Sequence, residues 1–175
     1  VLSLACEAEE GRSGMGSAVR ADLSVKVVAE YPHDPAAFTQ GLLWHDGKLY
    51  ESTGNYGRSS LREVRLQTGD VIRQISLPGN LFAEGLAKVD RKLIQLTWRE
   101  GIALVYDLSR LRESGRIQYG GEGWGLCYDG NWLVMSDGSD VLTYRDPDSM
   151  AIWKRLPVTF RGAPVKSLNE LEYAQ

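Results

Sequence analysis

Cysteine and histidine are scarce in this sequence, which has two of each among 175 residues. Cys6 and Cys127 are far apart and form no CxxC pair, and His33 and His45 do not have the spacing of metal ligands. Tetrahedral zinc sites are built from clustered cysteine and histidine side chains. We therefore expect no zinc site, and we expect no cofactor.

Long apolar runs and an excess of positive charge are also absent. No stretch approaches the roughly 20 apolar residues of a membrane-spanning helix, so we expect no membrane span. The formal net charge is −3. This balance argues against binding nucleic acid or an acidic membrane surface through bulk charge.

Glycine and aromatic residues, in contrast, are plentiful: 19 Gly, 8 Tyr and 5 Trp. Hydrophobic residues make up 43% of the chain and charged residues 25%, which is typical of a globular protein. Many glycines and aromatics without long apolar runs favour an all-β chain of short strands and turns.

The first residues differ from the rest. Residues 1–22 begin with a short apolar stretch, followed by Cys6 and a polar run rich in Gly, Ser and Glu. This segment resembles the end of a bacterial secretion signal, with a lipoprotein cleavage site at Ala5–Cys6. A disordered tail is the alternative, because a lipobox usually has Leu where Ser3 stands. We expect a secreted or periplasmic protein, with Cys6 as a candidate lipid anchor and residues 23–175 as the folded domain.

Internal repetition organises that domain. Three segments share a Gly-Leu step, a polar turn and an alternating strand: "TQGLLWHDGKLYESTG", "AEGLAKVDRKLIQLTW" and "GWGLCYDGNWLVMSDG". A fourth copy begins in "LNELEYAQ". The aligned leucines are residues 42, 86, 126 and 171, so the repeat lengths are 44, 40 and 45.

Each repeat continues with two more expected strands. The third strand of each is predicted over Leu61–Leu66, Ile102–Asp107 and Val141–Arg145, where apolar and polar residues alternate as in a sheet with one face more buried. Four short strands in about 40–45 residues is the period of a β-propeller blade. An antiparallel sandwich with coincidental Gly-Leu steps is the alternative.

The number of repeats predicts part of a ring. Propellers usually close with four to eight blades, whereas this sequence contains about three blades and the first strand of a fourth. We therefore expect a partial, C-terminally truncated propeller.

Seven motifs in register match a known family. They are "FTQGL" (Phe38–Leu42), "YESTGNYGRSSLREV", "EGL" (Glu84–Leu86), "QLTW", "GWGL", "SDGS" and "LNELEY". Together they closely resemble the plant-type glutaminyl cyclases, or glutamine cyclotransferases, of plants and bacteria. This resemblance implies an all-β, five-bladed propeller with an active site at one mouth of the central channel. It also implies a monomer that converts the N-terminal glutamine of peptides or proteins to pyroglutamate, with loss of ammonia and without a catalytic metal.

The resemblance also implies roles for single residues. Glu84 falls on the family's acid/base, and Asn169 on an amide that orients the substrate. Phe38, Phe82, Trp98 and Trp124 match aromatic residues of the substrate pocket, and Gln40 matches a polar substrate contact.

The chemistry needs such residues. In this intramolecular aminolysis the tethered amine attacks its own side-chain carbonyl, so what remains is proton transfer. One carboxylate can take a proton from the amine and return it to the leaving nitrogen. A partly apolar pocket would raise its pKa towards the working pH, while amide donors could stabilise the developing oxyanion.

Each assignment has a structural alternative. Glu84 can be an ordinary turn residue, and propeller tryptophans often pack between blades. Glu51 competes with Glu84, but its polar surroundings suggest a loop in which Glu51 pairs with Arg58. Aspartates in the Gly-rich turns, Asp129, Asp137 and Asp140, most often brace their own backbone, and a calcium site is the alternative that no further pattern supports. A propeller that only binds peptides remains the alternative function.

Overall fold

The computed structural model of the chain describes residues 2–5 and 26–174, and regular structure within these ranges consists of β-strands. The first sheet comprises β3 (Thr39–His45), β4 (Lys48–Thr53), β5 (Ser60–Val64) and β6 (Val71–Ser76). The second comprises β7 (Ala83–Val89), β8 (Lys92–Thr97), β9 (Ile102–Asp107) and β10 (Arg112–Gln118). The third comprises β11 (Leu126–Tyr128), β12 (Leu133–Met135), β13 (Val141–Arg145) and β14 (Ile152–Pro157).

Two short strand pairs lie outside these sheets. β1 (Leu2–Ala5) pairs with β2 (Lys26–Glu30), and β15 (Thr159–Phe160) pairs with β16 (Ala163–Pro164). Most of the predicted N-terminal segment 1–22, including Cys6, lies outside the described residues.

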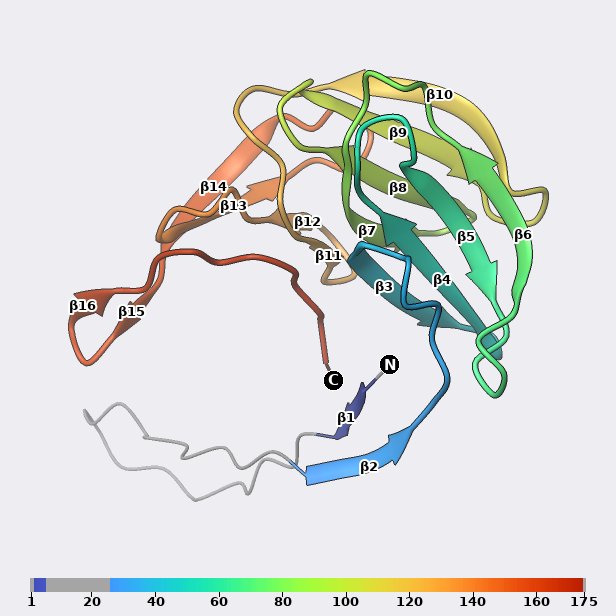
Figure 1. Ribbon diagram of the computed structural model, residues 1–175. Helices are drawn as coiled ribbons and strands as arrows, with labels where there is room; N and C mark the ends of the chain where they lie inside the picture. Colours follow the sequence, from blue (N-terminus) through green and yellow to red (C-terminus); the bar gives the residue numbers. More distant parts are fainter. Residues whose placement is uncertain (1, 6–25, 175) are drawn as a thin grey trace.

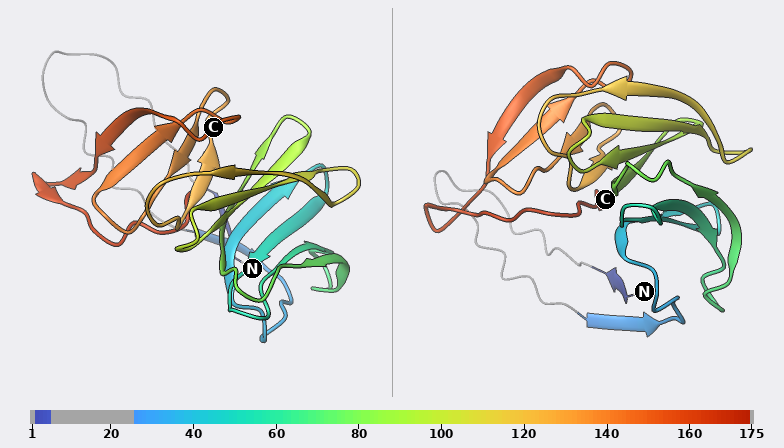
Figure 2. Two further views of the ribbon diagram at one scale, coloured as in Figure 1. Left: turned by 90° about the horizontal axis from the view of Figure 1, so that it is seen from above. Right: turned by 45° about the horizontal axis from the view of Figure 1, so that its top comes forward.

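The three sheets are arranged as successive blades around a common centre (Figure 1). In each blade the strands follow one another in antiparallel order, with β3, β7 and β11 innermost and β6, β10 and β14 outermost. The further views show the blades stacked side by side, each twisted relative to the next (Figure 2). The predicted all-β blade architecture is confirmed.

Tight turns join the first two strands of each blade at the polar positions that the repeat predicts. Asp46 and Gly47, between β3 and β4, have φ angles of 50° and 74°. Two successive positive φ angles define the type I′ turn, whose twist matches that of a hairpin. Asp90 has φ 49° in the equivalent turn of the second blade.

The core consists of two apolar layers, one on each side of the second blade. Leu93 and Leu104 of this blade face the first blade, where they join a cluster with Tyr50 and Leu61. Its alternate residues, including Ile94, join a second cluster towards the third blade. Both faces of this sheet are therefore buried, whereas the alternation predicted one face more buried than the other. The reason is that a blade in the middle has a neighbour on each side.

Two boundaries differ from the sequence-based expectation. The third strand of the first blade ends at Val64, two residues before the predicted Leu66, because residues 66–68 form the turn to β6. Residues 168–174, expected to begin a fourth blade, contain no assigned strand. They have no antiparallel partner among the described residues and instead lie against the third blade, where the N–H of Gly138 donates to the carbonyl of Leu168 at 3.2 Å.

The described residues include no helix with the length and apolar character of a membrane span. They also contain no group of three or more His, Cys, Asp or Glu side chains that could hold a metal ion.

Candidate functional site

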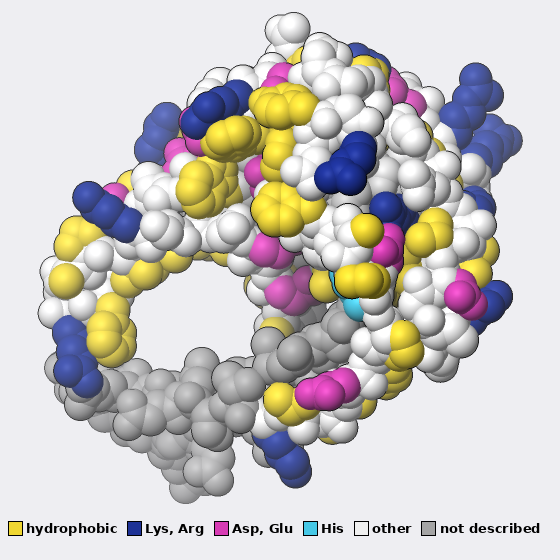
Figure 3. All heavy atoms as spheres, in the orientation of Figure 1, with side chains coloured by type: hydrophobic (Ala, Val, Ile, Leu, Met, Phe, Trp, Pro, Cys, Tyr) yellow, Lys and Arg dark blue, Asp and Glu magenta, His cyan; other side chains and the backbone are white. Residues whose placement is uncertain are grey.

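One cavity of about 300 Å³ brings together all of the residues that the sequence predicts for the site. It lies where the innermost strands of the three blades begin. Its lining consists of Phe38, Gln40, Phe82, Glu84, Trp98, Trp124 and Asn169. On the face shown in Figure 3, hydrophobic side chains gather over the loops that join the second and third blades, with acidic and basic side chains beside them.

Backbone hydrogen bonds hold the pocket residues in equivalent places on successive blades. In the first blade, the carbonyl of Phe38 accepts from the N–H of Gly54 at 2.8 Å. In the second, the carbonyl of Phe82 accepts from the N–H of Trp98 at 2.9 Å. Each bond joins the residue near the start of the innermost strand to the residue after the second strand. The repeated Gly-Leu step therefore places its flanking side chains at the same mouth of the channel.

Glu84 is the second residue of β7, and only 6% of its surface is exposed. The side-chain amide of Gln40, on the neighbouring innermost strand, donates to Oε1 of Glu84 at 3.2 Å. The hydroxyl of Ser52 donates to the backbone carbonyl of Glu84 at 2.5 Å. Glu84 is therefore a buried carboxyl group held from the first blade, and not a solvated turn residue.

The surroundings of Glu84 favour its protonated form. Loss of solvent on burial, and then the negative charges of Glu122 and Glu100, raise the pKa of Glu84 to about 8. Burial disfavours a charged carboxylate, and like charges nearby add to this effect. A carboxyl group that titrates near neutral pH can both accept and donate a proton, as acid/base catalysis requires.

A close approach between β7 and β11 fixes the position of Glu84 relative to the third blade. The N–H of Gly85 donates to the carbonyl of Trp124 at 2.7 Å. A Cβ atom at Gly85 would lie 2.5 Å from the backbone nitrogen of Leu126, which no side chain can tolerate without moving the backbone. The glycine of the Gly-Leu step is thus required by the contact between adjacent innermost strands.

A buried network of polar side chains around Gln95 supports strand β7, which carries Glu84. The side chain of Gln95 on β8 is fully buried and donates to Oγ of Ser52 at 2.8 Å and to the carbonyl of Ser60 at 3.2 Å. Its Oε1 accepts from the hydroxyl of Tyr106 at 2.9 Å. Since Ser52 also donates to the backbone carbonyl of Glu84, these hydrogen bonds connect the interior of the second blade to Glu84.

Aromatic rings form the walls of the cavity. Phe82 lies between Phe38 and Trp98, with ring centroids 6.2 Å and 5.6 Å apart respectively. Tyr56 packs edge-on against Phe82 at 5.3 Å. The ring of Trp124 rests on Gly138, where a Cβ atom would come within 2.8 Å of the indole. These contacts give an apolar wall around one buried carboxyl group.

Asn169 reaches the cavity from the segment after β16. Its backbone carbonyl accepts from the hydroxyl of Ser136 at 2.7 Å. The neighbouring carboxylate of Glu170 accepts backbone N–H bonds from Leu126 on β11 and Leu42 on β3. Burial raises the pKa of Glu170 to about 9, and these bonds oppose the rise. Glu170, for which the sequence predicted no role, ties the segment to two innermost strands.

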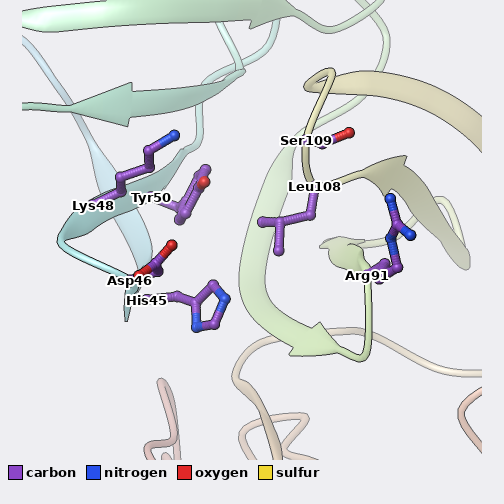
Figure 4. A pocket seen from close by; sticks show the side chains of 7 residues that line it. All are labelled: His45, Asp46, Lys48, Tyr50, Arg91, Leu108 and Ser109. Atoms are coloured by element: carbon purple, nitrogen blue, oxygen red, sulfur yellow. The ribbon is translucent and has the colours of Figure 1, made fainter.

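A second cavity, of about 220 Å³, lies at the opposite end of the first two blades. Its lining, shown in Figure 4, includes His45, Tyr50, Arg91 and Leu108. It contains none of the predicted site residues and sits beside the turns that follow β3 and β7. The chemistry suggested by the motifs therefore belongs to the first cavity.

The competing acidic residues have structural partners. The expected pair between Glu51 and Arg58 is not formed. Instead, Glu51 contacts Nε2 of His33 at 2.7 Å and accepts from the hydroxyl of Thr39 at 2.6 Å. Arg62 faces Glu51 across the β4–β5 ladder, with its Nη1 3.8 Å from Glu51 Oε2.

The predicted role of the turn aspartates is seen at Asp129 and Asp137. Asp129 Oδ1 accepts the N–H groups of Asn131 and Trp132 at 2.8 and 2.7 Å. Asp137 Oδ1 accepts the N–H of Ser139 at 3.0 Å. These side chains therefore brace their own turns.

Three polar residues beside the cavity were not predicted from the sequence. Glu122, Arg99 and Glu100 lie in irregular segments between strands, where no periodic pattern marks them. Glu122 stands two residues before Trp124, in a Gly-rich run that reads as an ordinary solvated turn. The only available signal was its closeness in sequence to a pocket tryptophan.

Comparisons with known proteins agree with this geometry. The family model described as glutamine cyclotransferase matches residues 1–175. A glutaminyl-peptide cyclotransferase of Arabidopsis thaliana is 41% identical over 167 residues, covering 91% of this chain and 52% of the relative. The crystal structure of the Myxococcus xanthus glutaminyl cyclase superposes with a TM-score of 0.79 at 42% identity, covering 85% of this chain and 63% of that one.

A more distant likeness supports the fold alone. The Neurospora crassa Pan2 WD40 domain has a TM-score of 0.56 at 12% identity, covering 68% of this chain and 36% of that one. The chain spans about half the length of the curated relative it matches. On the evidence of the full-length family match and the two close relatives, the chain belongs to the glutamine cyclotransferase family.

Proposed function

We propose that this chain carries the active site of a glutaminyl-peptide cyclotransferase, which converts the N-terminal glutamine of peptides to pyroglutamate. The observation that carries the proposal is Glu84, a buried carboxyl group whose pKa is raised to about 8 inside an aromatic pocket. Family membership supports the same reaction class.

The reaction closes a five-membered ring within the substrate. The neutral α-amine attacks the side-chain carbonyl carbon, a new C–N bond forms, and the C–N bond to the amide nitrogen breaks. Glu84 takes the proton that the attacking nitrogen loses and delivers it to the departing nitrogen, which leaves as ammonia. Both reacting groups belong to one residue, so the protein has mainly to orient them and move the proton.

The remaining lining residues have complementary roles in this proposal. Phe82, Trp98 and Trp124 enclose the glutamine side chain and exclude water. An indole face also tolerates the cationic α-ammonium group before it loses its proton. The amides of Gln40 and Asn169 contact the substrate, and a donated N–H near the carbonyl would stabilise the oxyanion that develops there.

An extracytoplasmic location is a second part of the proposal. It rests on the apolar start of the sequence before Cys6, and lipid attachment at Cys6 would anchor the protein to a membrane surface. Cell fractionation of the parent and a Cys6→Ser variant, with lipid labelling, tests this part independently of the chemistry.

The reaction is tested by measuring ammonia release from a Gln-initiated dipeptide with the purified chain and its Glu84→Gln variant. We expect turnover by the parent and at least a hundredfold loss in the variant, since general acid/base groups contribute about 10²–10⁴. A variant that keeps the parent's rate would remove Glu84 from the mechanism. Binding of the dipeptide without turnover in either protein would support a peptide-binding module.

A further inference from the structure

Glu122 connects the two tryptophans of the cavity, although it does not line the cavity itself. One carboxylate oxygen, Oε2, accepts the indole N–H of Trp98 at 2.8 Å and the indole N–H of Trp124 at 3.1 Å. Trp98 follows the second strand of the second blade, and Trp124 precedes the first strand of the third. A single side chain thus bridges two walls that come from different blades.

Arg99 completes this arrangement on the outer side. Its Nε donates to Oε1 of Glu122 at 3.1 Å, and its guanidinium carbon lies 3.6 Å from the centroid of the Trp98 ring. The cation therefore stacks on one indole and forms an ion pair with the carboxylate that holds both. Hydrogen bonds from Trp124, Trp98 and Arg99 lower the pKa of Glu122, so the group is an anion at neutral pH.

We propose that Glu122 is a positioning residue for the cyclisation pocket, because its carboxylate fixes the two indole walls. This inference deepens the proposed function and rests on it. Hydrogen bonds to an ionised acceptor are shorter and stronger than neutral ones, and two such bonds to one oxygen restrict the orientation of both indoles. The walls are then preorganised for the glutamine side chain before substrate arrives.

The charge of Glu122 has a separate effect. Glu122 and Glu100 are the two charged groups that act on Glu84, and both favour its protonated form. Arg99 faces Glu122 from the solvent side. Removing the charge at position 122 should therefore lower the pKa of Glu84 and move the acid limb of the kcat/KM profile to lower pH.

Two substitutions separate these effects. Glu122→Gln keeps a carbonyl oxygen that can accept both indole N–H bonds but removes the charge. Glu122→Ala removes the acceptor and the charge. Glu113→Ala is the matched control, because Glu113 makes an exposed ion pair with Arg116 at 2.6 Å on the outermost strand β10, away from the cavity.

The first measurement is kcat/KM for a Gln-initiated dipeptide as a function of pH. For Glu122→Ala we expect a loss of about ten- to hundredfold, mostly through a higher KM, as for the loss of hydrogen bonds to a charged group. For Glu122→Gln we expect the plateau value of kcat/KM to fall by no more than about threefold, because the indole hydrogen bonds are kept in weaker, neutral form. The acid limb of its kcat/KM profile should lie at lower pH than that of the parent. Glu113→Ala should match the parent in both respects.

The second measurement does not need catalysis. Tryptophan fluorescence reports the loss of the indole bonds, so the emission of Glu122→Ala should change while those of Glu122→Gln and Glu113→Ala match the parent. If the parent releases no ammonia, the proposed function fails, and this spectrum still decides the positioning role. Parent-like emission and kinetics in Glu122→Ala, or equal losses in the Ala and Gln variants with an unmoved pH profile, would overturn the inference.

Discussion

Replacing Gln95 by Leu should destabilise the protein far more than an ordinary polar-to-apolar change. The side chain of Gln95 is fully buried in the second blade and makes three hydrogen bonds, to Ser52, Ser60 and Tyr106. Leucine fills a similar volume but can satisfy none of these groups. The hydroxyl of Tyr106, itself 1% exposed, would lose its only recorded acceptor among the described residues.

The expected cost follows from the groups left behind. A buried donor or acceptor without a partner costs about 1–3 kcal/mol. The loss of the partner at Tyr106 carries this full cost, because that hydroxyl keeps no other acceptor among the described residues. The cost at Ser52 is smaller, because its hydroxyl still donates to the carbonyl of Glu84. We expect Gln95→Leu to lower the free energy of unfolding by about 2–4 kcal/mol, which is about 4–16 °C in melting temperature for a chain of this size.

Urea denaturation followed by circular dichroism measures this free energy. Tyr106→Phe alone should cost about 1–2 kcal/mol, by leaving Oε1 of Gln95 unpaired. The double variant should cost less than the sum of the two, because neither partner is then stranded. Gln118→Leu, on the exposed outermost strand β10, is the control and should change stability by less than about 0.5 kcal/mol. A Gln95→Leu effect as small as the control's would refute the view that this network supports the strand of Glu84.

Three further predictions concern Glu84 and its strand. The kcat/KM for a Gln-initiated peptide should rise with pH through about 8, as Glu84 loses its proton, and a flat profile between pH 6 and 9 would contradict its role as the base. A carboxyl group whose pKa is raised on folding, here from 4.5 to about 8, keeps a proton that the unfolded chain has released, so its contribution to stability falls as the pH rises across that interval. Glu84→Gln should therefore melt above the parent at pH 9 and close to it at pH 4, and equal melting temperatures at pH 9 would argue that the folded-state pKa is ordinary. Gly85→Ala would place a Cβ atom 2.5 Å from the nitrogen of Leu126 and should cost more than about 2 kcal/mol, whereas Gly115→Ala on β10, with open space around it, should be tolerated by the same urea assay.

Local signals made much of the fold predictable. The Gly-Leu step and a polar turn that begins with Asp recur in every blade, because each blade needs a close contact at its innermost strand and a sharp hairpin after it. The same repeat placed Phe38, Phe82 and Glu84 at one mouth. Their roles in the reaction rest on the family resemblance and on the proposed mechanism, and they stay predictions until the kinetics are measured.

Contacts between distant segments were not predictable in the same way. Glu51 meets Arg62 and not Arg58, because the loop between β4 and β5 sets a register that pairs residues 51 and 62 directly. Glu122 gave no sign of its bonds, since Trp98 is 24 residues earlier in the chain and approaches only when the second and third blades pack together. Burial on both faces of the second blade likewise depends on neighbours that alternation within a strand does not report.

The distribution of the pocket over three blades has a consequence for the order in which the protein assembles its candidate site during folding. Each four-stranded sheet forms from neighbouring segments, so its closure is local and fast, whereas the cavity needs contacts between residues as far apart as Gln40 and Asn169. In a refolding experiment, the strand signal should therefore recover first, and the environment of Trp98 and Trp124 should recover only when the blades dock. Under the proposed function, ammonia release would follow the slower step and would therefore report blade assembly.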